Sequence, residues 1–193
     1  MTATITRRAP DAIEAPPTTH RSGAGQVSLA VARIGVGFIF LWSFLDKMFG
    51  LGYSTTPAKS VLSGGSPTKG FLSHVDVGPF QSFFHSIAGT GIADWLFMVS
   101  LLGIGVAMIL GAGLRIAAVS TVLLMLGMWA AEWPMAKVAA DGSPTASSNP
   151  FMDYHLAYAV IGVVFAFYAT GSRLGLGHWW SNQAIVRKYS ALA

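Results

Sequence analysis

The stretch IADWLFMVSLLGIGVAMILG, residues 92–111, decides the fold class. It contains one charged residue, Asp94, and no polar stripe at helical spacing, so a helix formed here is apolar on every side. An α-helix needs about 20 consecutive apolar residues to cross the hydrocarbon layer of a bilayer, which is roughly 30 Å thick. We therefore predict a transmembrane helix over 92–111.

Three further segments, 27–49, 115–133 and 151–170, have a similar length and composition. Of the 193 residues, 53% are hydrophobic and only 10% are charged, whereas a soluble domain carries about 25% charged residues. Soluble core helices are the alternative interpretation, but they need polar stripes that these segments lack. We predict an all-α integral membrane protein with a four-transmembrane-helix bundle over 27–172. A disordered cytoplasmic tail, 1–26, precedes it, and a cytoplasmic C-terminal segment, 173–193, follows it.

The basic residues predict the orientation of this bundle. If the N-terminus is cytoplasmic, eight of the twelve lysines and arginines, including every arginine, lie on that side. An excess of basic residues marks the cytoplasmic side of a membrane protein. We therefore expect both termini in the cytoplasm and the chain in the cytoplasmic (inner) cell membrane.

The long outer loop, 50–91, contains a second helical pattern. Phe80, Phe83, Phe84 and Ile87 repeat at helical spacing, which predicts a short amphipathic helix. This helix would either lie in the membrane interface or cap the bundle.

Several classes of function are excluded by composition. The chain has no cysteine, so disulfides, thiolate metal sites and iron–sulfur clusters are not expected. The five histidines lack the spacing of a metal or haem site, and we predict neither group. The basic residues form no patch or basic helix, which argues against nucleic-acid binding.

Ionisable residues in the helices are the candidates for chemistry, because a charge in a bilayer is costly without a partner or a function. Six of them fall at the outer ends of the four segments: Asp46, Lys47, Asp94, Glu132, Asp153 and His155. Such a cluster could form an outward pocket that binds a quinol and transfers protons, and we take these six as catalytic candidates. The alternative is a ring of interfacial polar residues that sets helix depth.

Arg33, Trp42 and Trp129 are the candidates for contact with a cofactor. Arg33 lies one to two turns inside the first segment, where a backbone carbonyl, a lipid phosphate or a bound anion would have to be its partner. The two tryptophans also suit an aromatic belt at the membrane interface.

The opening of the first segment resembles a known family. The run Ala32-Arg33-Ile34-Gly35-Val36-Gly37-Phe38-Ile39-Phe40-Leu41-Trp42, followed by Asp46-Lys47 and Phe49-Gly50, is similar to the start of DoxX/DoxD-like bacterial membrane proteins. The Gly-Gly-Ser-Pro-Thr-Lys-Gly loop at 64–70 and the sequence Asn149-Pro150-Phe151-Met152-Asp153 also fit, and the long first loop looks like that of actinobacterial members.

The resemblance implies a function that the residues alone do not. The DoxD branch is associated with thiosulfate:quinone oxidoreductase, in which a membrane subunit works with a partner protein. By this resemblance we expect a subunit that supports quinone-linked oxidoreduction, with a bound quinone and a partner. The alternative is a non-catalytic scaffold, small-molecule carrier or accessory subunit of a larger membrane complex. A homo-oligomer and a hetero-oligomer are both compatible with the sequence.

Overall fold

Four long helices form the body of the protein in a computed structural model, which describes residues 23–145, 147–168 and 170–192. They are α1 (Gly23–Phe49), α4 (Gly91–Leu110), α5 (Leu114–Glu132) and α6 (Tyr154–Phe167). Over the described residues the chain is helical, without a β-strand, as the sequence predicts. The shorter elements are η1 (Pro57–Lys59), η2 (Val61–Ser63), α2 (Lys69–Leu72), α3 (Gln81–Ile87), η3 (Thr170–Ser172), α7 (Gly177–Ser181), α8 (Ala184–Lys188) and η4 (Ser190–Leu192).

Three of the long helices are long and apolar enough to cross a membrane. These are α1, α4 and α5, with 27, 20 and 19 residues. The fourth, α6, is equally apolar but has only 14 residues, so the prediction of a helix over 151–170 was too long. Its start is set by Asp153, whose Oδ1 accepts a hydrogen bond from the Leu156 amide at 3.1 Å and thereby caps the first turn.

The other predicted boundaries differ by smaller amounts. α4 and α5 lie within one residue of the predicted segments, and the turn between them contains Gly111 and Gly113, both with a φ of 68°. α1 begins at Gly23 rather than at residue 27, and Gln26 in its first turn accepts a 2.9 Å hydrogen bond from Arg173 Nε. Residues 23–26, which the sequence assigns to the tail, therefore belong to α1, and residues 1–22 lie outside the described part.

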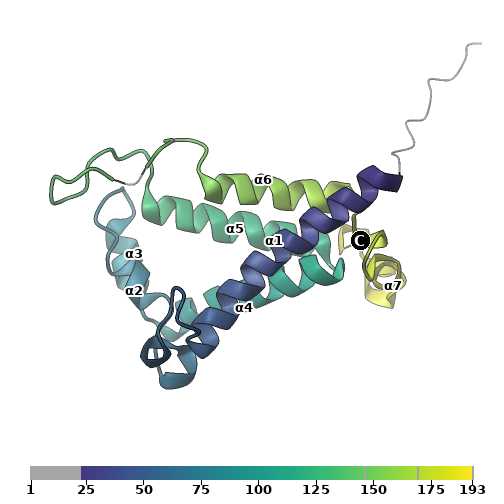
Figure 1. The fold of residues 1–193 in the computed structure, drawn as a ribbon, viewed down its shortest axis with the longest axis horizontal. Helices are drawn as coiled ribbons and strands as arrows, with labels where there is room; N and C mark the ends of the chain where they lie inside the picture. Colours follow the sequence, from purple (N-terminus) through teal and green to yellow (C-terminus); the bar gives the residue numbers. More distant parts are fainter. Residues whose placement is uncertain (1–22, 146, 169, 193) are drawn as a thin grey trace, which may run out of the picture.

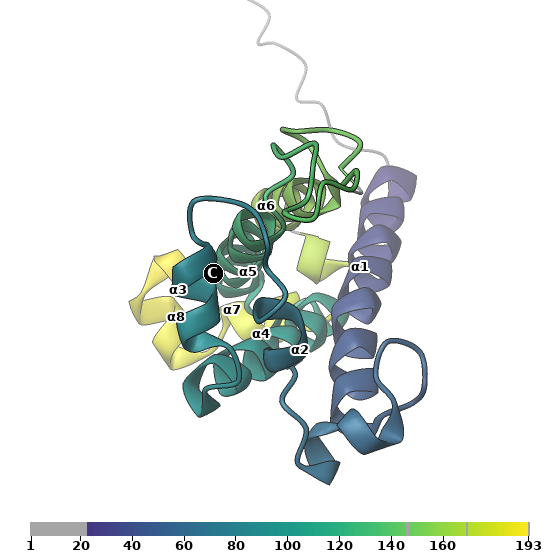
Figure 2. The same ribbon diagram turned by 90° about the vertical axis from the view of Figure 1, so that its left-hand side faces the viewer.

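The four helices form two antiparallel pairs, α1 with α4 and α5 with α6 (Figure 1). We call the end that holds the α4–α5 turn the turn end, and the opposite end the loop end. The pairs meet at the turn end and diverge towards the loop end, where α2 and α3 lie between them (Figures 1 and 2).

One apolar core joins all four helices. Its buried members are Phe40 of α1, Leu101, Ile104 and Met108 of α4, Ala117 and Met125 of α5, and Ala159 of α6. α1 and α4 approach closely because both have glycine at the crossing. A methyl group added to Gly105 would lie 2.7 Å from the Leu41 amide nitrogen. Small residues at such crossings are typical of packed membrane helices.

Large apolar side chains also cover the outside of the helices. Leu123 on α5 is 67% exposed and Phe167 on α6 is 79% exposed. A soluble protein rarely exposes apolar surface of this extent, whereas lipid is a good solvent for it. The exposed helices are therefore compatible with contact to a bilayer, and they indicate a membrane protein.

The predicted amphipathic helix is present as α3 and rests on α5. Phe84 is buried in a small second core that also contains Leu72, Val75 and, from α5, Ala131. Ile87 packs against this core. Phe83, and Phe80 just before α3, are exposed over 57% and 50% of their surface, and the Phe80 ring also meets the Trp133 ring edge-on at 6.4 Å. α3 thus covers the loop end of α5 with one face, and Phe83 on α3 is exposed together with the preceding Phe80.

Candidate functional site

Arg33 is completely buried near the turn end, where it joins three parts of the chain. Its guanidinium group donates hydrogen bonds to the carbonyl oxygens of Met108 and Ile109, at the last turn of α4. It also donates to the carbonyl oxygen of Leu174 at 3.1 Å, in the segment after α6. Carbonyls at the end of a helix lack intrahelical partners and carry partial negative charge. Of the three partners considered from sequence, backbone carbonyls are the ones that Arg33 contacts.

Asp46 lies at the end of α1 and binds the loop that follows. Its carboxylate is 1% exposed and accepts hydrogen bonds from the amide groups of Tyr53 and Ser54, at 3.2 and 3.0 Å, and from the Ser54 hydroxyl at 2.6 Å. Lys47 lies beside it, with its ammonium group 5.9 Å from the centre of the Phe97 ring. These contacts stabilise the loop. They occupy both carboxylate oxygens of Asp46, so its surroundings do not indicate a ligand site.

Asp94 has the same role at the start of α4. Its Oδ1 accepts hydrogen bonds from the Ser66 hydroxyl at 2.9 Å, from the Thr68 amide at 3.0 Å and from the Thr68 hydroxyl at 2.6 Å. These hydrogen bonds therefore hold the long loop against the start of α4.

The other three catalytic candidates come together where α5 ends and α6 begins. His155 is completely buried, with Nδ1 2.7 Å from Asp153 Oδ2 and Nε2 3.9 Å from Glu132 Oε1. Glu132 Oε1 also accepts a 3.0 Å hydrogen bond from the Tyr154 hydroxyl. Because α5 and α6 are antiparallel neighbours, the last residue of one helix lies beside the first turn of the next. We call Glu132, Asp153, Tyr154 and His155 the α5–α6 cluster.

A pocket of about 810 Å³ opens beside the α5–α6 cluster. Its wall includes Glu132, Asp153 and Tyr154, together with His74 and Asp76 from the loop between α2 and α3. The volume is in the range of pockets that bind organic ligands. Asp46, Lys47 and Asp94 are not part of this wall. The structure thus places two of the six predicted residues, Glu132 and Asp153, in the wall of one pocket, with His155 buried behind them. The other three bind loop backbone or pack on an aromatic ring.

The two tryptophans named as cofactor candidates lie in different surroundings. Trp42 contacts the Phe38 and Tyr53 rings, with centroid distances of 5.9 and 5.3 Å. Trp129 is one helical turn before Glu132 on α5, and its buried Nε1 has no hydrogen-bond partner among the described residues. A buried donor without a partner is unusual, so Trp129 is the tryptophan whose surroundings are compatible with a ligand.

Tyr154 was not anticipated from the sequence. It is next to Asp153 at the start of α6, but its partner Glu132 lies 22 residues earlier, and no spacing rule connects two such positions. The available signal was that the apolar segments 115–133 and 151–170 follow each other and form a hairpin. In a hairpin the end of the first helix lies beside the start of the second.

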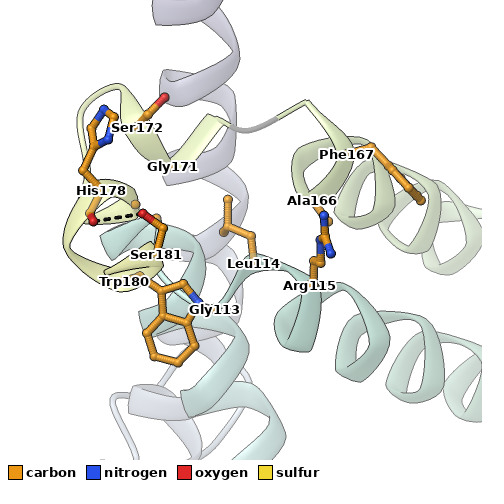
Figure 3. Close-up of a pocket in the computed structure, with 12 residues that line it drawn as sticks. Gly113, Leu114, Arg115, Ala166, Phe167, Gly171, Ser172, His178, Trp180 and Ser181 are labelled. Atoms are coloured by element: carbon orange, nitrogen blue, oxygen red, sulfur yellow. Dashed lines mark hydrogen bonds between the residues drawn. The ribbon is translucent and has the colours of Figure 1, made fainter. Parts of the chain in front are cut away.

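A second pocket lies at the turn end. It has a volume of about 270 Å³ and is lined by Arg115, Ala166 and Phe167 on one side and by residues of α7 on the other. Figure 3 shows Arg115 and Ala166 on the side of this pocket away from Ser181, which donates a hydrogen bond to the His178 carbonyl at 3.0 Å. This pocket contains none of the six catalytic candidates.

Comparisons with known proteins do not identify a family for the chain. No protein-family model matches the chain, and comparisons with curated proteins and with solved structures give no significant similarity.

Proposed function

We propose that the chain is a DoxX/DoxD-like membrane subunit that binds a quinone in the pocket beside the α5–α6 cluster and supports quinone-linked oxidoreduction with a partner protein. The observation that carries this proposal is a pocket whose wall contains two carboxylates and a tyrosine, with a buried histidine in contact with one of those carboxylates. Quinone sites need hydrogen-bonding groups for the ring oxygens and acid–base groups for the protons, and the cluster supplies both kinds.

The chemistry assigned to the chain is proton transfer. Reduction of a quinone to a quinol consumes two electrons and two protons. In the proposal the partner protein supplies the electrons, taken from a donor such as thiosulfate, and Glu132 and Asp153 pass protons to the quinone oxygens. The 3.0 Å hydrogen bond from Tyr154 holds Glu132 at the pocket wall.

The proposal also includes four membrane crossings with both termini in the cytoplasm. α6 alone is short, but it pairs with α5 along its length, from the Glu132–Tyr154 contact at the loop end to the close approach of Gly111 and Gly171 at the turn end. Tyr154 and Gly171 therefore lie near the two ends of α5. The excess of arginine near the turn end supports a cytoplasmic location for that end and a location in the cytoplasmic (inner) cell membrane.

The test is the quinone content of protein extracted gently from its membrane. We expect about one quinone per chain in the wild type, and a reduction of about tenfold or more in Glu132→Gln, because a hydrogen bond to a charged group contributes roughly 1.5–3 kcal/mol. Asp141→Asn is the matched control, since Asp141 is exposed and its carboxylate binds Ser143 at 2.9 Å outside the pocket wall. Equal quinone content in Glu132→Gln and wild type would refute the assignment of the site.

A second candidate function, a scaffold that recruits a partner protein, has support from α3. Phe80 and Phe83 are exposed there beside the second core, and exposed aromatic residues are frequent in protein interfaces. Stoichiometric co-purification of a partner that Phe83→Ser abolishes, without quinone in the complex, would favour this function.

A further inference from the structure

The Asp153–His155 pair has the geometry of a histidine that is prepared to bind a metal ion. Asp153 Oδ2 lies 2.7 Å from His155 Nδ1, and a carboxylate oxygen accepts hydrogen bonds, so the imidazole tautomer that fits this contact carries its proton on Nδ1. The Nε2 atom is then left with a free lone pair. Histidines that bind metals usually donate their other ring N–H to a carboxylate in this way, which fixes the tautomer and orients the ring.

The Nε2 atom of His155 has no hydrogen-bond partner among the described residues, although the side chain is completely buried. A buried polar atom normally has a partner in the protein, in water or in a ligand. The nearest acidic oxygen is Glu132 Oε1 at 3.9 Å, which is too far for a hydrogen bond.

The same distance suits two ligands of one metal ion. Two atoms that each lie about 2.1 Å from a tetrahedral zinc ion are about 3.4 Å apart. A movement of about half an ångström by the Glu132 carboxylate would bring it to that separation, and this side chain is 38% exposed and able to move. The ligand atoms that Glu132, Asp153 and His155 can offer all lie within 4.8 Å of one another.

We propose that the α5–α6 cluster is a binding site for a divalent metal ion, which we assign as zinc. His155 Nε2 and Glu132 are the protein ligands, and Asp153 is a positioning residue that holds the imidazole ring. An imidazole nitrogen combined with carboxylate oxygen suits zinc among the divalent ions. Because Glu132 and Asp153 also line the 810 Å³ pocket, water or a ligand oxygen from the pocket fills the remaining coordination positions. This proposal is the opposite of the prediction from histidine spacing, which indicated no metal site.

The test measures metal binding by the full chain, purified without a polyhistidine tag, stripped with chelator and titrated with Zn²⁺ in the absence of quinone. We expect one zinc ion per chain in the wild type. Glu132→Gln and His155→Gln should weaken binding at least about tenfold, and Asp153→Asn should weaken it about 10- to 100-fold through loss of the imidazole's partner. In Co²⁺-loaded protein, the visible absorption bands should change in Asp153→Asn.

His85→Ala is the control, because the His85 ring binds the Val75 carbonyl at 2.8 Å, outside the cluster. It should bind zinc as the wild type does. Glu132→Gln keeps the proposal testable if His155→Gln fails to fold, since Glu132 is partly exposed. Absence of stoichiometric zinc in the wild type, or equal affinity in Glu132→Gln, would overturn the proposal. Zinc and quinone are measured separately, so a failure of one proposal does not imply a failure of the other.

Discussion

At the scale of single residues, similar carboxylates at the helix ends have different partners. Asp46 and Asp94 each bind backbone amide and hydroxyl groups of the long loop. Glu132 and Asp153 instead meet a buried histidine beside a pocket. The difference lies in the loops, because both helix pairs are direct neighbours. The long loop folds back onto Asp46 and Asp94. Glu132 and Asp153 instead contact side chains at the start of α6.

Arg33 provides the first residue-scale prediction. Arg33→Ala should lower the free energy of unfolding by at least about 3 kcal/mol, because it leaves buried carbonyl groups of α4 and of the segment after α6 without donors. Arg33→Lys should be intermediate, since an ammonium group lacks the planar fork that reaches both sets of carbonyls. Thermal unfolding in a constant detergent measures both variants.

Arg187→Ala serves as the comparison for Arg33→Ala. Arg187 is an exposed arginine near the C-terminus, so its removal should change stability by less than about 0.5 kcal/mol. If Arg33→Ala unfolds at the same temperature as Arg187→Ala, then the buried guanidinium group does not stabilise the contact between α1, α4 and the segment after α6.

At the scale of elements, the contact between α1 and α4 depends on glycine at the crossing. An added methyl group at Gly37 would lie 2.8 Å from Met108 Cβ, and one at Gly105 would lie 2.9 Å from Leu41 Cα. Neither distance is tolerated without movement of one helix. The close approach lets the backbones pack tightly, which compensates in lipid for the weak hydrophobic force between helices.

Gly105→Ala should therefore destabilise the protein by about 1–3 kcal/mol, the usual cost of overpacking a well-filled contact. Gly103→Ala is the matched control on the same helix, because an added methyl group there meets nothing within 4 Å. Its stability should stay equal or rise slightly with the better helix propensity of alanine. Equal unfolding temperatures for the two variants would contradict the packing described at this crossing.

At the scale of the whole molecule, the two helix pairs are joined by shared structure at both ends. Arg33 connects them at the turn end, and the segment that contains α2 and α3 connects them at the loop end through Asp94 on one side and Ala131 on the other. The pocket beside the α5–α6 cluster includes loop residues that this segment supplies. Disruption of the long loop would therefore affect the pocket as well.

The proposed crossing of α6 can be tested by cysteine labelling, since the chain has no cysteine of its own. Ser148→Cys and Ser181→Cys place exposed thiols before and after α6. In right-side-out membrane vesicles an impermeant maleimide should label Ser148→Cys directly, and Ser181→Cys only after the membrane is opened. Ser86→Cys on α3 should behave like Ser148→Cys. Labelling of Ser148→Cys and Ser181→Cys from the same side would show that α6 does not cross.

Local sequence patterns were enough to predict the helical class, the positions of α1, α4 and α5 to within a few residues, and the short helix α3. It could do so because an apolar run of about 20 residues and a helical repeat of phenylalanines are local properties of the chain. The length of α6 was predicted less well, because its start depends on capping by Asp153 rather than on apolar composition.

Which polar residues share a site depends on the three-dimensional packing of the chain. Equal depth in four predicted segments could not distinguish Asp94, which binds Thr68, from Glu132, which faces His155. It also could not show that Arg33 binds backbone carbonyls of α4. These pairings join residues that are from 23 (155 − 132) to 76 positions apart. They depend on how the helices pack against one another and on how the loops fold over them, and no local pattern in the chain encodes either.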